Sequence, residues 1–217
     1  MLKGITHGLR KFWSDLTSGD LLILGLSIVL AVTAISSVSF LGDRLKSSIK
    51  QQASVVLGAD LSFRSASELG TQYLESAEGQ ALKTAETVSF LSMAIANEDN
   101  LLSSIKATTP TYPLRGQLII TDFNGQAIDH TGSPKRGYLW VEPKLVEQLG
   151  LQQNNVMAIG KTNFIVAGIL KDFPDRNVGF LAFSPTIIAN INDLGAMGVI
   201  QTGSRVVYRN LLSLIHI

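Results

Sequence analysis

The chain has 217 residues, with 18 basic and 17 acidic side chains and a formal net charge of +1 at pH 7. Its charges form no blocks of one sign, so the sequence offers no electrostatic basis for binding nucleic acid. Because the chain contains no cysteine, disulfides, thiolate metal sites and cysteine nucleophiles are excluded, although the compartment is not identified.

Residues 1–20 predict a short amphipathic leader that lies on a membrane surface. Its apolar positions share one face of a helix, and they are Ile5, Leu9, Phe12, Trp13 and Leu16. The basic residues Lys3, Arg10 and Lys11 fall elsewhere on that helix. We expect Phe12 and Trp13 to sit at the depth of the lipid headgroups.

An uncharged run without proline covers residues 21–41 and predicts a transmembrane helix with Leu21 and Leu41 as its ends. At about 1.5 Å rise per residue, such a helix matches the hydrocarbon thickness of a bilayer. A cleaved secretory signal is the first alternative, with Ser37-Val38-Ser39 as its cleavage site, but the run exceeds the roughly 7 to 15 apolar residues of signals. A buried helix of a soluble protein is the second, but long core helices rarely lack every charge.

The charges beside this run do not decide its orientation. Three basic residues precede it, and Arg44, Lys46 and Lys50 follow it. The positive-inside rule therefore gives a tie, and a cytoplasmic N-terminus is permitted but not required.

The segment after residue 42 predicts a mixed α+β domain of short strands and helices. A helical stripe of Leu45, Ile49, Ala53 and Val56 indicates that the membrane helix continues to residue 57. The patterns that follow predict strands over 59–64, 87–96, 101–107, 138–141 and 206–212, and a helix over 68–82.

Turn residues predict two hairpins and two further helices. One hairpin joins 117–123 to 126–128 through a two-residue turn at Asn124-Gly125, and the other joins 156–159 to 163–170 at Gly160-Lys161. Pro143 predicts the start of a two-turn helix that ends at residue 149 before Gly150. By the same logic, Ser184-Pro185 predicts a helix to about Asp193.

The sequence shows no pattern typical of an enzyme or of a metal site. Gly160-Lys161-Thr162 lacks the earlier glycine of a phosphate-binding loop, and His7, His130 and His216 lack the spacing of metal ligands. The carboxylate pairs Asp172 with Asp175, and Glu98 with Asp99, are interpreted as solvated loop residues. We therefore predict no catalytic, cofactor-binding or metal-binding residue.

Several segments, in this order along the chain, resemble one family of membrane proteins. Its short motifs include Lys106-Ala107, Tyr112-Pro113-Leu114-Arg115-Gly116 and Pro174-Asp175-Arg176. The longer segments are FWSDLTSGDLLILGLSIVLAV, DRLKSSIKQQASVVLGADLSFRS, YLWVEPKLVEQLGL, IGKTNFIVAGIL and GSRVVYRNLL. Together they are similar to the start of an FtsX-like ABC transporter permease with a MacB-type periplasmic core domain. Asn154-Asn155 stands where that family usually has a Gly-Asp turn. Asparagine is a tolerable replacement for the glycine, because after glycine it adopts the left-handed backbone region most readily.

The resemblance implies a non-catalytic subunit of the bacterial inner membrane, with a cytoplasmic N-terminus and a periplasmic main domain over residues 42–212. It implies a separate ABC-type ATP-binding subunit, a second permease copy and membrane lipids as partners, no cofactor, and a role in export or in lipid and lipoprotein handling. The substrate and the identity of the ATPase stay open. Because the family continues into more domain and further spans, residues 213–217 are expected to be the tail of a truncated product.

Two interpretations remain beside the permease. One is a single-pass anchored module that binds a periplasmic partner without any transporter, and the other is a membrane-anchored hydrolase, for which no nucleophile and base are visible. Within the motif, we expect Tyr112, Pro113, Leu114, Arg115 and Gly116 to form a rigid loop between two strands. Pro113 fixes its own φ and restricts Tyr112, and Gly116 allows a close backbone approach.

Overall fold

The computed structural model describes residues 19–68, 70, 79, 82–176, 183–201 and 203–214. The chain divides into two compact units, Met1–Gln51 and Gln52–Ile217, which are described separately here. Phe12 and Trp13, predicted to lie at the membrane surface, are outside the described residues, as is nearly all of the predicted helix over 68–82.

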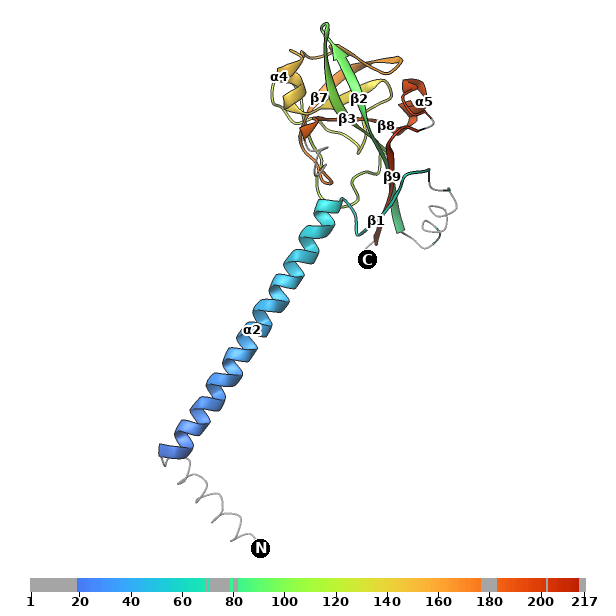
Figure 1. The fold of residues 1–217 in the computed structure, drawn as a ribbon. Coiled ribbons are helices and arrows are strands. Elements are labelled where there is room, and N and C mark those ends of the chain that lie inside the picture. The colour runs from blue at the N-terminus through green and yellow to red at the C-terminus, as the bar shows by residue number, and fades with distance from the viewer. Residues whose placement is uncertain are drawn as a thin grey trace. The chain divides into compact units, whose positions relative to one another are not determined.

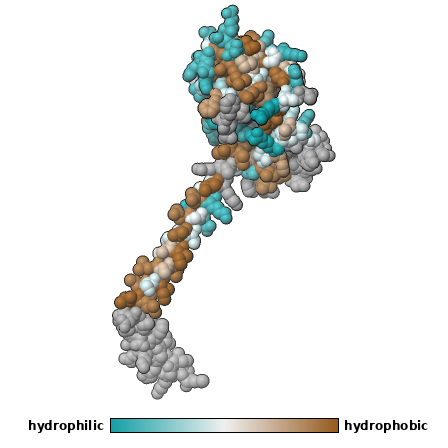
Figure 2. Space-filling view, viewed as in Figure 1, coloured by the Kyte–Doolittle hydropathy of each residue, from teal (hydrophilic) through white to brown (hydrophobic). Residues whose placement is uncertain are grey.

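One long helix, α2 (Gly19–Leu57), begins the described chain (Figure 1). It contains the predicted span and continues past Leu41 without a break, as the helical stripe indicated. Residues 22–57 are long and apolar enough to cross a membrane, and Figure 2 shows mostly apolar side chains along them. The hydroxyls of Ser27 and Thr33 donate to the carbonyls of Leu24 and Val29, so these polar groups are satisfied within the helix.

The helix ends at a glycine whose backbone is left-handed. Gly58 has a φ of 70° and its N–H donates to Val55 O, while the N–H of Ala59 donates to Ser54 O. This pair of bonds is the Schellman arrangement, which satisfies carbonyls that the helix leaves without partners. The last turn belongs to the second compact unit, which begins at Gln52.

That unit is built on a mixed sheet of nine strands. The hydrogen-bonded order is β1 (Leu61–Ser65), β9 (Val206–Leu214), β2 (Leu82–Ala96), β3 (Asp99–Thr108), β8 (Thr186–Asn190), β5 (Tyr138–Val141), β7 (Thr162–Asp172) and β4 (Ile119–Thr121). β6 (Val156–Ile159) pairs with both β7 and β2. The β3–β8 and β5–β7 pairs are parallel, and the other pairs are antiparallel. The predicted α+β class is therefore confirmed.

The double pairing of β6 closes a ring that runs β2, β3, β8, β5, β7, β6 and back to β2. The main hydrophobic core fills the inside of this small barrel, and its members include Phe90, Ile105, Val141, Phe164 and Ile187. A smaller cluster with Trp140, Phe173 and Ile188 covers part of the outer face. Closure removes exposed strand edges within the ring, while β9 and β1 extend the sheet beyond it.

Several predicted elements after residue 137 are confirmed. β5 has the predicted bounds, and α4 (Pro143–Gln148) begins at Pro143 and is followed by Gly150 with a φ of 56°. The β6–β7 hairpin turns at Gly160, where φ is 60°. Asn154 has a φ of 63°, so this asparagine takes the left-handed conformation expected of it.

The helix predicted from Ser184-Pro185 to Asp193 is wrong. The segment forms strand β8, followed by the one-turn 3-10 helix η2 (Ile191–Asp193) and the short helix α5 (Leu194–Met197). β8 lies between β3 and β5, and all five of its residues are buried. Since Ile187 enters the barrel and Ile188 enters the outer cluster, both faces are apolar, and the sequence period cannot separate such a strand from a helix.

The first hairpin is confirmed, but its turn is longer than predicted. Only Gly125 has a positive φ, at 84°, and Asn124 does not. Asp122 closes the turn instead, because its Oδ1 accepts from the N–H groups of Asn124 and Gln126 at 2.9 and 2.7 Å. An aspartate that bonds to the backbone just ahead replaces the two-residue turn with a three-residue one.

Candidate functional site at the end of the long helix

Two loops of the second unit hold the last turn of α2. Asp175 donates its N–H to Val56 O at 2.7 Å, and Leu114 and Arg115 both donate their N–H groups to Gly58 O at 2.9 Å. Carbonyls at a helix end have no partner within the helix. Here the domain supplies those partners, so the end of α2 is fixed by backbone bonds to the sheet's own loops.

The motif loop that begins at Tyr112 joins β3 to β4 and touches this helix end. Tyr112 is buried, is joined to Pro113 by a cis peptide bond, and donates its hydroxyl to Pro174 O at 3.0 Å. Gly116 has a φ of 84°, and a Cβ there would lie 3.3 Å from Val55 O and 3.4 Å from Pro174 Cβ. The close backbone approach expected at Gly116 is thus present in the structure, whereas the functional role of the loop stays a prediction.

A buried group of charges lies directly behind the loop, and the sequence analysis missed it. Asp172 is a solvated residue, with 62% of its side chain exposed, but the same prediction for Asp175 is wrong because only 8% is exposed. Lys106 Nζ, on β3, donates to Asp175 O at 2.6 Å and lies 3.3 Å from its Oδ2. Arg209, on β9, donates to Asp175 Oδ1. One carboxylate is shared by two basic side chains.

Burial dominates the electrostatics of this cluster. It lowers the pKa of the Lys106 amino group, although the Asp175 carboxylate opposes the shift. Burial also raises the pKa of the Tyr112 hydroxyl, which therefore stays protonated and donates. The Lys106 Nζ lies 5.3 Å from the centre of the Phe173 ring and 5.8 Å from that of Tyr112. These ring faces add to the environment of an ammonium group.

The cluster could have been suspected from one feature of the sequence. Lys106 lies at a position of an apolar strand where a charge is unexpected, and lysine is almost never fully buried unless paired. Its partner could not be found, because five elements (β4, β5, α4, β6 and β7) lie between Lys106 and Asp175 along the chain. Only the fold brings Lys106, Asp175 and Arg209 together.

A second, more exposed network ties the residues after the helix to the motif loop and to β9. Arg115 donates from Nε and Nη2 to the two carboxylate oxygens of Asp60 at 3.0 and 2.9 Å. Ser213 Oγ and Leu214 N donate to Asp60 Oδ2 at 2.6 and 3.1 Å. The bonds from Arg115, helped by those from Ser213 and Leu214 and opposed by burial, lower the pKa of Asp60 to about 2. β9 thus includes the first two residues of the segment predicted as a tail.

The remaining candidate residues do not gather into a chemical site. Gly160-Lys161-Thr162 forms the β6–β7 turn, and His130 packs edge-on against Trp140 at 5.3 Å between ring centres. His7 and His216 lie outside the described residues. In the part of the chain that the structure describes, no group of His, Asp and Glu side chains is arranged to hold a metal ion. The bonds at the end of α2 hold its last turn, which belongs to the second compact unit, against the loops at Leu114 and Asp175.

Comparison with known proteins supports the class indicated by the sequence. The chain is 28% identical over 200 residues to the ABC transporter permease YbbP of Escherichia coli, a match that covers 92% of this chain and 24% of that protein. The predicted resemblance to ABC transporter permeases is confirmed by this match, and the chain spans about a quarter of the relative's length. No protein-family model matches the chain.

Two solved domains show a weaker likeness. The extracellular domain of the noncanonic ABC-type transporter YknZ from Gram-positive bacteria has a TM-score of 0.48 and 13% identity, with 71% of this chain and 82% of that chain covered. The periplasmic region of MacB from Actinobacillus actinomycetemcomitans has a TM-score of 0.46 and 10% identity, with 72% and 77% covered. Because both scores are low, we infer function from the sequence match and from the geometry of this chain.

Proposed function

We propose that the chain is the N-terminal part of the permease subunit of an ABC transporter in the bacterial inner membrane. Its leader and N-terminus face the cytoplasm, α2 crosses the bilayer, and the barrel domain lies in the periplasm. A separate ATP-binding subunit supplies the energy, and a second permease copy completes the pathway. The sequence match over nearly the whole chain is the observation that carries this proposal.

The contacts between the last turn of α2 and the loops at Leu114 and Asp175, called the junction below, support a specific role within that assembly. α2 is a single helix from Gly19 to Leu57, and its last turn is bonded to the loops at Asp175 and Leu114. A continuous helix held at its end by backbone bonds and a buried charge cluster transmits displacement better than a flexible linker does. We infer that the domain moves with the helix when ATP binding or hydrolysis shifts the cytoplasmic side, and that this motion serves export or lipid and lipoprotein handling.

Topology is the first test. Because the chain has no cysteine, Ser14→Cys and Gln153→Cys give single labelling sites, and Gln153 is exposed. An impermeant maleimide applied to cells with a permeable outer membrane should label position 153 and spare position 14, while both label after the inner membrane is opened. Carbonate at high pH should leave the protein in the membrane pellet. The reverse labelling pattern would overturn the proposed orientation.

Coupling is the second test, made on the complete permease with its ATP-binding subunit. Spin labels at Gln153→Cys report the distance between two permease copies with and without ATP. Inserting Gly-Gly-Ser between Leu57 and Gly58 should abolish the ATP-dependent change in distance, because the helix then no longer carries the domain. The same insertion after Gly125, at an exposed turn, should preserve it.

The outcomes separate the proposal from its competitor. Copurification with a subunit that binds ATP, together with a distance change that only the junction insertion removes, supports the permease. Failure to recover any ATP-binding subunit after cross-linking would favour the anchored binding module instead. A distance change that survives the junction insertion would refute the mechanical role.

A further inference from the structure

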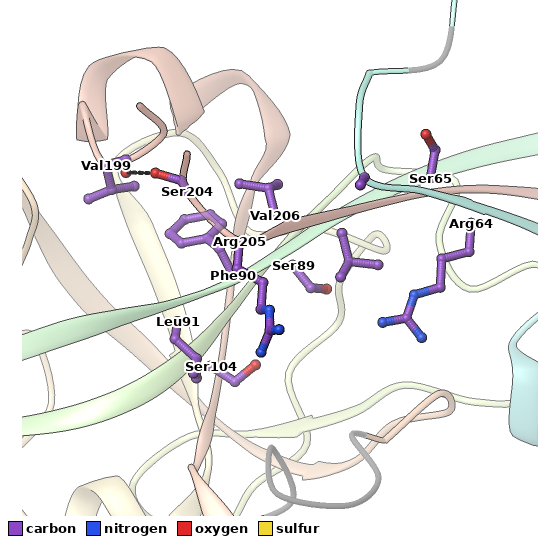
Figure 3. A pocket seen from close by; sticks show the side chains of 12 residues that line it. Arg64, Ser65, Ser89, Phe90, Leu91, Ser104, Val199, Ser204, Arg205 and Val206 are labelled. Carbon is purple, nitrogen blue, oxygen red and sulfur yellow. Dashed lines mark hydrogen bonds between the residues drawn. The ribbon is translucent and has the colours of Figure 1, made fainter. Parts of the chain in front are cut away.

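A cavity of about 750 Å³ opens on the outer face of the barrel's sheet, where β1, β9 and β2 run side by side. Arg64 lines it from β1, Ser89 and Leu91 from β2, and Arg205 from the position just before β9 (Figure 3). Val207, on β9, also lines it. This cavity shares no lining residue with the contacts at the end of α2.

Strand register places these side chains on one face. Ser89 is directly opposite Val207 on β9 and Lys106 on β3, and Leu91 is opposite Ser104. Directly opposed residues of an antiparallel pair project to the same side of a sheet. The cavity therefore shares the outer face with the buried Lys106, and it lies outside the barrel's core.

The two arginines of the cavity are the notable feature. Arg115, Arg136, Arg176 and Arg209 each form an ion pair with a carboxylate. Among the described residues, Arg64 and Arg205 form none, and both are exposed. Among the described residues that line the cavity, none is acidic. Figure 3 shows both side chains extending to the same side, so two guanidinium groups face one space in which the described residues place no counter-charge.

The remaining lining is hydroxylic and apolar. The hydroxyl groups come from residues that include Ser89 and Ser204. An apolar strip leaves the cavity along β2, because Leu91, Met93 and Ile95 are 36%, 40% and 48% exposed on its outer face. Leu102, directly opposite Met93, is 42% exposed and widens the strip. A positively charged cavity thus adjoins an exposed apolar surface.

We propose that this cavity binds an amphipathic phosphate. The phosphate group is held by Arg64 and Arg205, and the attached apolar chain lies along the strip that begins at Leu91. Guanidinium groups form paired hydrogen bonds to phosphate and to carboxylate. Two guanidinium groups from separate segments of the chain favour phosphate, because the oxygens of phosphate point in several directions while those of a carboxylate lie in one plane. The proposal does not depend on transport.

Calorimetric titration of the full chain in micelles of a neutral detergent tests the proposal with three probes: hexyl phosphate, inorganic phosphate and hexanol. Titration into empty micelles gives the background for partitioning. Hexyl phosphate should bind the chain, and Arg64→Gln with Arg205→Gln should weaken that binding at least tenfold. Lys161→Gln with Lys171→Gln removes the same charge from two exposed positions that do not line the cavity and should change the affinity less than twofold.

Two further comparisons identify what the cavity recognises. Arg64→Lys with Arg205→Lys keeps the charge but loses the guanidinium fork, so its affinity should fall between those of the wild type and the glutamine variant. Inorganic phosphate should bind at least fivefold more weakly than hexyl phosphate, which identifies an amphiphile as the source of the phosphate. Equal affinity for the two would overturn the apolar half of the proposal and indicate free phosphate.

Folding is controlled independently, because both arginines are exposed and the urea midpoint of each variant should match that of the wild type. Binding of hexyl phosphate that is unchanged in the glutamine variant, or lost equally in the lysine control pair, would refute the site. So would the absence of any heat above the micelle background.

Discussion

Replacing Asp175 with asparagine tests the buried cluster that lies behind the end of α2. Asparagine keeps the size of the side chain and tolerates the positive φ of 56° at this position. The change removes the carboxylate shared by Lys106 and Arg209 while leaving the backbone bond to Val56 in place. Its effect therefore isolates charge from shape.

The magnitude follows from burial. Removing one partner of a buried ion pair costs about 3–5 kcal/mol, because the other charge stays in a poorly solvated site. Lys106 is 1% exposed, whereas Arg209 is 24% exposed and can reach water. Lys106 can escape by losing its proton, which costs at most about 5 kcal/mol at pH 7 for an ordinary pKa near 10.5. We expect Asp175→Asn to lower the free energy of unfolding by about 3 kcal/mol or more.

The assay is urea unfolding of the full chain in detergent micelles, followed by the fluorescence of Trp140. This residue is 5% exposed and packs in the outer cluster with Phe173. The chain has two tryptophans, so Trp13→Phe leaves a single signal from the domain. Asp172→Asn is the matched control, because it breaks an exposed ion pair with Arg176 and should cost about 0.5 kcal/mol or less.

Two further measurements give the reason for the loss. In a Lys106→Met background, Asp175→Asn should cost much less, since no buried amino group is left without its partner. The destabilisation should also shrink as the pH rises from 7 towards 10.5. Burial lowers the pKa of Lys106 in the folded state, so the folded chain loses the Lys106 proton at a lower pH than the unfolded chain does. The cost of deprotonating Lys106 on folding therefore falls as the pH rises towards the point where the unfolded chain loses this proton as well. A loss no larger than that of Asp172→Asn would refute the buried cluster.

Three other predictions concern the junction and the sheet. Gly116→Ala should destabilise the chain by about 1 kcal/mol more than Gly125→Ala does. Both glycines have a φ of 84°, but only Gly116 has a backbone atom within 3.4 Å of an added Cβ. Equal losses in urea unfolding would contradict this close approach. The pKa of Asp60 is lowered from 3.8 to about 2, so its pairing with Arg115 contributes stability above pH 4 that disappears as the pH falls through 2. This contribution is on the order of 1 kcal/mol for a partly exposed pair. Asp60→Asn should therefore flatten the dependence of the unfolding free energy on pH between pH 2 and 5. Ile188→Ala should cost about 2–5 kcal/mol because the residue is fully buried. A loss below about 1 kcal/mol would contradict the burial of this side chain in the outer cluster.

The elements that the sequence predicted correctly are those whose conformation depends on residues nearby in the chain. Proline at a first helical position and glycine after a helix end predicted α4, because backbone geometry at these residues is fixed within one turn of chain. The same holds for the β6–β7 hairpin and for α2, whose uncharged run over residues 21–41 is long enough to cross a bilayer. The class of transporter also came from the order of short motifs along the chain, and the match to a permease confirms it.

Other features were decided only by tertiary structure, for one physical reason: they depend on which distant segments meet. The segment Thr186–Asn190 became a strand because β3 and β5 lie on its two sides, and no local pattern distinguishes this from a buried helix. Closure of the barrel needs β6 to pair with β2, which its own sequence does not indicate. The sequence around Asp175 indicates a solvated loop residue, but Lys106 and Arg209 approach it from two strands and its side chain is buried. The sequence by itself determined where α4 begins and that a long apolar helix leads into an α+β domain. Long-range contacts determined which charges are buried and which loops bond to the last turn of α2.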